Sequence, residues 1–146
     1  MVELQRAYQV RTPATEGFAT EGIKSLDEYR GDAALPVVYG VAGRVVEKLL
    51  ARIGSQPMGI ERIAEDLSMS KRTLQRRLQQ QDLNFAQLRD QVRFHYAIGY
   101  LLEQHSSVDN ISTLLDFSDR TSFTNAFKRW TGLSPSAFRK LFRDYV

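Results

Sequence analysis

Cationic and amide side chains are concentrated between Ser70 and Gln80. These eleven residues hold four cations and no acid, which makes them the densest basic stretch in the chain. Leu74 and Leu78 lie four residues apart and would point inward from a helix, so a polar set is left to point outward. With Arg77 flanking it, that outward set consists of Lys71, Arg72, Gln75, Arg76 and Gln79. Arginine can donate two hydrogen bonds to O6 and N7 of guanine, and glutamine suits adenine similarly. The predicted base contacts are Arg72, Gln75 and Arg76, with Lys71 nearer the phosphates.

A second polar face is predicted between residues 118 and 131. Ser118 can cap a helix N-terminus. The apolar positions, spaced so that they share one buried face, are Phe123, Phe127 and Trp130. The opposite face is left to Arg120, Thr121, Thr124, Asn125 and Lys128. Gly132 lies where a helix end favours a left-handed residue, and Ser134 followed by Pro135 restarts a helix. The aromatic residues could also be imagined as platforms for single-stranded bases, but their helical spacing favours core packing.

Helical apolar periods also predict the elements that hold these two faces. The remaining helices are expected at residues 38–53, 60–67, 84–104, 107–115 and 134–142, with Gly59 before the second and residues 143–146 as a tail. The long helix begins at Asn84 and, at about 1.5 Å per residue, is near 30 Å long. Its expected buried positions are Phe85, Leu88, Val92, Tyr96, Ala97, Tyr100, Leu101 and Leu102.

An internal repeat of about 48 residues supports this plan. The segment that begins at Ile63 echoes the segment that begins at Ile111, and each reads as a short helix, a turn, a cap and a second helix. The second copy has one extra residue before its inward Phe123. Two helix-turn-helix units, at about 59–80 and 107–131, are therefore predicted on either side of the long helix.

The chain closely resembles the AraC/XylS family of bacterial transcription regulators over residues 41–142. The second copy matches the family through Phe117, Ser118, Asp119, Ser122, Phe123, Ala126, Phe127, Lys128, Arg129, Trp130, Gly132, Ser134, Pro135 and Arg139. The first copy and the long helix match through Met69, Ser70, Leu74, Gln75, Arg76, Arg77, Leu78, Phe85, Arg93, Ala97, Tyr100 and Leu101. The resemblance implies an all-α fold of seven helices, in which two helix-turn-helix subdomains are joined by a long central helix.

The resemblance also implies a function and its residues. It implies a sequence-specific regulator that binds double-stranded DNA at promoters, activates transcription and contacts RNA polymerase. Arg120, Thr121, Thr124 and Asn125 occupy positions that face DNA in the family. Backbone contacts are expected from Ser118, Lys128, Arg139 and the helix N-terminus at Ser134, and Ser70 and Gln79 complete the predicted surface. Successive major grooves on one side of the duplex lie about 34 Å apart, so one monomer could read two of them.

The chain departs from the family pattern at three positions. Asp116 stands where a turn glycine is usual, Ser112 where an alanine is usual, and Asn125 where an arginine is frequent. Aspartate tolerates a left-handed turn better than most residues, so the fold should survive. A missing arginine, with Asp116 and Asp119 nearby, should weaken the second unit on DNA. We therefore expect the first recognition helix to carry most of the affinity.

Composition and charge narrow the classes of function and the kinds of site that the chain can have. The net charge is +3, and the excess lies in residues 55–146, which hold thirteen basic and ten acidic side chains. The chain has no cysteine, which excludes disulfides and thiolate catalysis. Its two histidines, His95 and His105, have no neighbour at ligand spacing, and no catalytic grouping stands out. We therefore expect no enzyme activity, cofactor or metal. No apolar run suits a membrane span or a signal peptide, so a cytoplasmic protein is expected.

Two questions stay open at this level. Residues 1–37 show no sustained period, which predicts a poorly ordered arm or the remnant of a sensor region. They are too few for the sensor domain of the larger family members, which argues against effector binding unless they belong to something that has been lost, so the sequence leaves effector binding open. The alternative to a DNA reader is a helical protein-interaction module, such as a truncated regulator that dimerises with a longer relative. Salt-sensitive binding of duplex DNA by the chain would separate the two.

Overall fold

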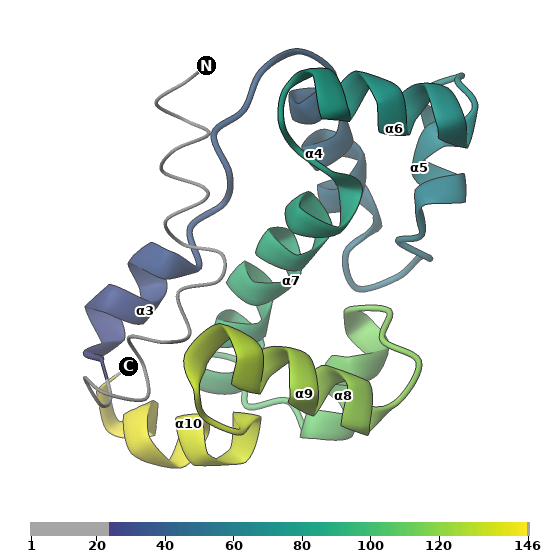
Figure 1. Cartoon of the computed structure of the whole chain (residues 1–146). Helices are drawn as coiled ribbons and strands as arrows, with labels where there is room; N and C mark the ends of the chain where they lie inside the picture. The colour runs from purple at the N-terminus through teal and green to yellow at the C-terminus, as the bar shows by residue number, and fades with distance from the viewer. Residues whose placement is uncertain (1–23, 146) are drawn as a thin grey trace.

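The computed structural model describes residues 24–145, and all regular secondary structure in this part of the chain is helical (Figure 1). The described helices are α3 (Leu26–Asp32), α4 (Gly40–Arg52), α5 (Ile60–Asp66), α6 (Lys71–Gln80), α7 (Phe85–Leu102), α8 (Val108–Leu114), α9 (Arg120–Thr131) and α10 (Pro135–Phe142), followed by a 3-10 turn at Arg143–Tyr145. The predicted all-α fold, with two helix-turn-helix units joined by a long central helix, is confirmed. No helix among the described residues has both the length and the apolar character to cross a bilayer.

Side-chain caps explain where most of these helices begin. Ser70 accepts a hydrogen bond from the Thr73 amide at 3.1 Å, and Ser107 and Ser134 cap α8 and α10 in the same way. Asn84 forms a reciprocal capping box with Gln87 at the start of α7. Each cap satisfies backbone amides that a helix N-terminus otherwise leaves without partners.

The prediction that Ser118 caps α9 is wrong. The cap is Asp119, whose carboxylate accepts the Ser122 amide at 2.7 Å. That hydrogen bond lowers the pKa of Asp119 below its usual value. In both units the cap lies four residues before the first inward side chain, so the extra residue of the second copy moves the cap from Ser118 to Asp119.

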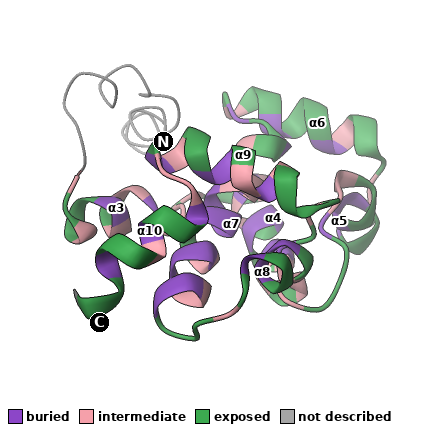
Figure 2. Ribbon diagram, turned by 90° about the horizontal axis from the view of Figure 1, so that it is seen from below, coloured by how far each residue is buried: buried purple, intermediate pink, exposed green. Residues whose placement is uncertain are grey.

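Two hydrophobic cores are built on the two halves of α7. The first core joins α4, α5 and α6 to the N-terminal half of α7, and its fully buried side chains include Leu49, Met58 and Leu74. The second joins α8, α9 and α10 to the C-terminal half, around Phe127 and Phe138. Figure 2 shows buried positions running along α7, with exposed residues on the outer faces of α6 and α9. Because α7 serves both cores, it holds the two units together.

The buried face of α7 is wider than the apolar period predicts. Tyr96 and Tyr100 are only half-buried, whereas Gln91, Arg93, Phe94 and Ile98 are also buried. Both buried polar residues, Gln91 and Arg93, have hydrogen-bond partners in distant segments. Gln91 Nε2 donates to the carbonyls of Asp32 and Ala34 at 2.7 and 2.8 Å, and Arg93 donates to carbonyls of the α8–α9 turn. A polar side chain can be buried at low cost when its hydrogen bonds are made in this way.

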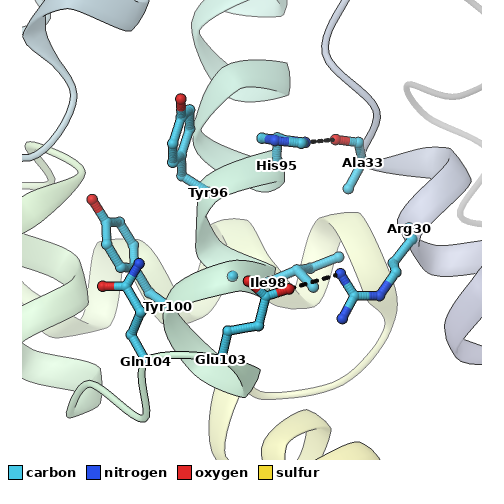
Figure 3. Close-up of a pocket in the computed structure, with 9 residues that line it drawn as sticks. Arg30, Ala33, His95, Tyr96, Ile98, Tyr100, Glu103 and Gln104 are labelled. Carbon is cyan, nitrogen blue, oxygen red and sulfur yellow. Dashed lines mark hydrogen bonds and ion pairs between the residues drawn. The ribbon is translucent and has the colours of Figure 1, made fainter. Parts of the chain in front are cut away.

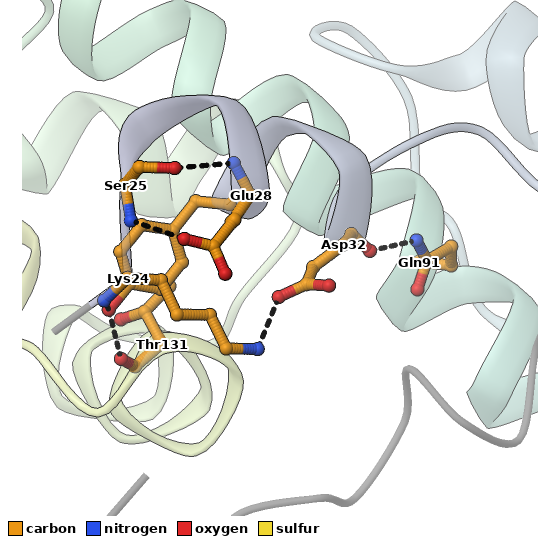
Figure 4. A network of polar contacts seen from close by, with 7 residues as sticks. Lys24, Ser25, Glu28, Asp32, Gln91 and Thr131 are labelled. Atoms are coloured by element: carbon orange, nitrogen blue, oxygen red, sulfur yellow. Dashed lines mark hydrogen bonds and ion pairs between the residues drawn. The ribbon is translucent and has the colours of Figure 1, made fainter. Parts of the chain in front are cut away.

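The N-terminal segment differs from the sequence expectation. Sequence alone predicts a poorly ordered arm or the remnant of a sensor region for residues 1–37, whereas Leu26–Asp32 form a capped helix packed on the second unit (Figure 4). Tyr29 is fully buried, and its hydroxyl donates to the Thr131 carbonyl at 3.1 Å. Ser25 and Glu28 form a capping box, and Lys24 pairs with Asp32 at 2.7 Å. The part of the predicted arm at 1–23 lies outside the described residues.

Candidate nucleic-acid interface

The outer face of α6 presents the predicted cationic and amide side chains to solvent. Leu74 and Leu78 are fully buried and fix the rotation of the helix. The exposed residues are Lys71, Arg72, Gln75, Arg76 and Gln79, with Ser70 exposed at the cap. Lys71 lies 3.3 Å from Glu61 in an exposed ion pair. Among the described residues, Arg72 and Arg76 have no acidic partner within ion-pair distance. Their guanidinium groups are therefore available to an external acceptor.

The outer face of α9 is less strongly cationic. Phe123, Ala126 and Phe127 are buried, and the opposite face holds the predicted residues. Arg120, Thr121, Asn125 and Lys128 are exposed, and Thr124 is half-buried. Arg120 lies 3.7 Å from Asp109, and the capping Asp119 stands directly before it. A ligand for Arg120 would have to compete with this carboxylate.

The turns that precede the two recognition helices share one backbone conformation. Ser68 and Asp116 occupy equivalent repeat positions, and both are left-handed, with φ of 56° and 59°. In each turn the amide of the next residue donates to a carbonyl of the preceding helix. The Met69 amide donates to the Ala64 carbonyl at 3.0 Å, and the Phe117 amide donates to the Ser112 carbonyl at 2.9 Å. Aspartate is thus tolerated where the family usually has glycine, as expected.

A polar side chain in the second unit is also accommodated. Ser112 is buried, and its hydroxyl donates to the Asp109 carbonyl at 2.7 Å. A buried hydroxyl with a partner costs little, which explains why serine replaces the usual alanine here.

The two recognition helices lie at opposite ends of α7 (Figure 1). α7 has 18 residues, so at about 1.5 Å per residue it is roughly 27 Å long. That length is of the same order as the roughly 34 Å between successive major grooves on one side of B-form DNA. The central helix thus lies between the two polar helical faces, one near each of its ends.

Of the predicted backbone contacts, Arg139 has hydrogen-bond partners within the fold. Its Nε donates to the Leu101 carbonyl at 2.9 Å, and its Nη2 donates to the Ser106 carbonyl. Both acceptors lie where α7 ends, so Arg139 ties α10 to the C-terminus of the central helix. Partial burial also lowers the pKa of the Arg139 guanidinium. We therefore propose that Arg139 stabilises the fold rather than contacting a phosphate.

The other predicted backbone contacts remain accessible. Ser118 is exposed, and its hydroxyl lies 3.2 Å from that of Ser122. Lys128 is exposed near the C-terminus of α9, whereas the half-buried Ser134 is the N-cap of α10. These groups surround the outer face of α9 without being part of its core.

Sequence reasoning missed Arg89, which lies beside the α6 face. An open groove between α6 and the start of α7 is lined by Lys71, Gln75, Gln79 and Arg89. The Arg89 guanidinium carbon stands 5.5 Å from the centre of the Phe85 ring. No local signal marks Arg89, because a charged residue on a long helix usually lies on a solvated face.

A separate cavity of about 210 Å³ lies between α3 and α7 (Figure 3). Its walls include the ion pair of Arg30 with Glu103, at 3.3 Å, and His95. His95 Nδ1 lies 3.0 Å from the Ala33 carbonyl oxygen, which gives this ring a structural partner. None of the residues predicted to contact DNA lines the cavity.

Comparison with known proteins places these features in a family. Residues 63–141 match a family model described as a helix-turn-helix domain. The chain is 37% identical over 111 residues to the HTH-type transcriptional regulator VqsM of Pseudomonas aeruginosa, covering 76% of this chain and 34% of that protein. It is 34% identical over 137 residues to the ornithine utilization regulator of the same organism, covering 94% of this chain and 39% of the relative.

A solved structure agrees with these matches. The crystal structure of transcriptional regulator CdpR from Pseudomonas aeruginosa superimposes with a TM-score of 0.63 at 31% identity, covering 69% of this chain and 32% of that one. In all three comparisons the chain spans less than two fifths of the other protein.

Proposed function

Because the chain belongs to the AraC/XylS family of helix-turn-helix transcription regulators, we propose that it reads specific double-stranded DNA with α6 and α9 in two adjacent major grooves. The observation that carries this proposal is the pair of exposed polar faces at opposite ends of α7. A rigid central helix of roughly 27 Å suits two grooves about 34 Å apart. One monomer is then enough to span both grooves.

Within this proposal, each face divides into base contacts and backbone contacts. On α6, Arg72, Gln75 and Arg76 contact base edges, while Lys71 and Ser70 lie nearer the phosphates and Gln79 extends the face. On α9 the base-reading positions are Arg120, Thr121, Thr124 and Asn125, and the flanking phosphate contacts are Ser118, Lys128 and Ser134. If about six phosphates are neutralised, the slope of log affinity against log salt is roughly −5.

The two faces differ in charge, and we propose that they differ in affinity. Helix α6 has four cations, of which only Lys71 has an acidic partner among the described residues, Glu61 at 3.3 Å. The cations of α9 include Arg120, which is paired with Asp109, and Arg129, which lies 3.5 Å from Asp90. The α6 face therefore supplies most of the attraction to DNA, and α9 adjusts the total and adds sequence information.

The biological role follows from the family. We propose that the protein activates transcription by binding near promoters as a monomer and presenting a surface to RNA polymerase. Its site of action is then the bacterial cytoplasm, where the chromosome lies.

Salt-dependent binding of a labelled duplex, measured by fluorescence anisotropy, tests the proposal. The Arg72→Ala/Arg76→Ala double variant should lose most of the affinity. The matched control is Lys140→Ala/Arg143→Ala, which removes the same charge from exposed positions outside both faces and should bind nearly normally. Absence of duplex binding by the unmodified chain at low salt would overturn the proposal in favour of a protein-interaction module.

A further inference from the structure

The side chain of Asp116 connects the two helix-turn-helix units directly. Its Oδ2 accepts a hydrogen bond from the Met58 amide at 2.8 Å. Asp116 lies in the turn between α8 and α9, whereas Met58 lies in the loop between α4 and α5. The Met58 side chain is fully buried in the first core. One hydrogen bond therefore joins the turn of the second unit to a residue anchored in the first.

A second contact reinforces the same junction. The Gly54 amide donates to the Leu114 carbonyl at 3.0 Å, so the α4–α5 loop meets the end of α8 at two points. Ile53 and Tyr96 pack against both cores. The two units therefore touch through this loop as well as through α7, which is visible where the α4–α5 connection approaches α8 in Figure 1.

The other side of the turn is fastened to α7 by a buried arginine. Arg93 Nε donates to the Leu115 carbonyl at 2.7 Å, and its Nη2 donates to the Asp116 carbonyl at 2.6 Å. The Arg93 guanidinium carbon also lies 4.0 Å from the centre of the Phe117 ring. Burial lowers the pKa of Arg93 to about 10. The turn that aims α9 is thus held between α7 and the first unit.

The residue type at position 116 matters because of its backbone conformation. With φ at 59°, glycine would adopt this turn without strain and would remove only the carboxylate. Asparagine also tolerates the left-handed region and keeps a side-chain oxygen that can accept the Met58 amide. The two substitutions therefore separate the inter-unit hydrogen bond from the shape of the turn.

We propose that Asp116 is a positioning residue that fixes the orientation of α9 relative to α6 and thereby restricts the spacing between the two DNA half-sites. This inference rests on the proposed function, in which both helices read DNA. Inserting one base pair between the half-sites moves the second by about 3.4 Å and rotates it by about 34°. A chain whose two units are held in one orientation cannot follow that movement without breaking the hydrogen bond between Asp116 and Met58.

The hydrogen bond between Asp116 and the Met58 amide is tested without DNA, by hydrogen exchange at that amide. Asp116→Gly should lower protection of this amide by roughly tenfold, the order expected for a hydrogen bond to a charged group. Asp116→Asn should keep most of the protection. Circular dichroism establishes that both variants remain folded. Equal protection of the Met58 amide in the chain and in Asp116→Gly would overturn the proposal.

The consequence for DNA is tested with a series of duplexes in which the half-site spacing is changed by one base pair in either direction. The unmodified chain and Asp116→Asn should disfavour the altered spacings by about tenfold or more, whereas Asp116→Gly should disfavour them less than about threefold. Normal binding by the chain with the same spacing preference in Asp116→Gly overturns this inference alone. Failure of the chain to bind any duplex overturns the proposed function as well, even where the exchange result is as expected.

Discussion

Changing Arg76 to alanine is expected to weaken DNA binding more than changing Arg120 to alanine. Both arginines are exposed on recognition helices, but their surroundings differ. Arg76 has no acidic partner among the described residues, whereas Arg120 lies 3.7 Å from Asp109. The comparison therefore isolates the charge environment of the two faces.

The size of each loss can be estimated from these contacts. A bidentate arginine contact to guanine contributes about 1–3 kcal/mol, so removing Arg76 should cost about 2 kcal/mol, or roughly thirtyfold in affinity. Arg120 must first leave Asp109. The side chains of this pair are 56% and 72% exposed, so it belongs to the weak surface class of about 0.2–1 kcal/mol. The net loss on removing Arg120 should then be about 1–1.8 kcal/mol, or roughly five- to twentyfold in affinity.

Fluorescence anisotropy with a labelled duplex that carries the preferred site measures both losses. Asp109→Asn provides a matched control, because it removes the competing charge and should increase the effect of Arg120→Ala. Equal losses for Arg76→Ala and Arg120→Ala, or a larger loss for Arg120→Ala, would refute the reasoning that α6 carries most of the affinity.

The remaining predictions concern individual contacts. Tyr29→Phe should lower the free energy of unfolding by about 1 kcal/mol, because it loses the hydrogen bond to Thr131. Tyr29→Ala should lower it by about 3–5 kcal/mol. Urea unfolding measures both losses, and no loss would argue against α3 as part of the second unit. Lys128→Ala should reduce the magnitude of the salt slope by about 1 without changing stability. Arg139→Ala should lower stability by about 2 kcal/mol and leave the slope unchanged; the reverse pattern would return Arg139 to the phosphate contacts. Ser70→Ala should cost about 1 kcal/mol in thermal unfolding, whereas Ser70→Asp should not.

Apolar periodicity was a good guide to the fold because the repeating inward positions are short-range features. Leu74, Leu78, Phe123 and Phe127 are all fully buried, as their spacing predicts. The same logic identified the outward residues of α6 and α9. Local sequence therefore specifies which face of each recognition helix points away from its core.

The missed features depend on partners that are distant in sequence. Arg93 and Gln91 are buried because they donate to carbonyls of other segments, and no local pattern reports those acceptors. The proposed role of Arg139 in the fold also rests on a distant partner, since its Leu101 acceptor is 38 residues away. By contrast, α3 had a usable local signal. Ser25 and Glu28 have the spacing of a capping box, and Tyr29 follows as the residue to be buried.

Selection of binding sites from a random duplex library, at two salt concentrations, tests most directly whether one chain reads two adjacent major grooves. The proposal predicts a site with two short blocks about 10 base pairs apart, enriched at both salts and lost in the Arg72→Ala/Arg76→Ala variant. Enrichment of a single block would contradict reading by both helices. Enrichment of no sequence at either salt would contradict sequence-specific DNA binding altogether.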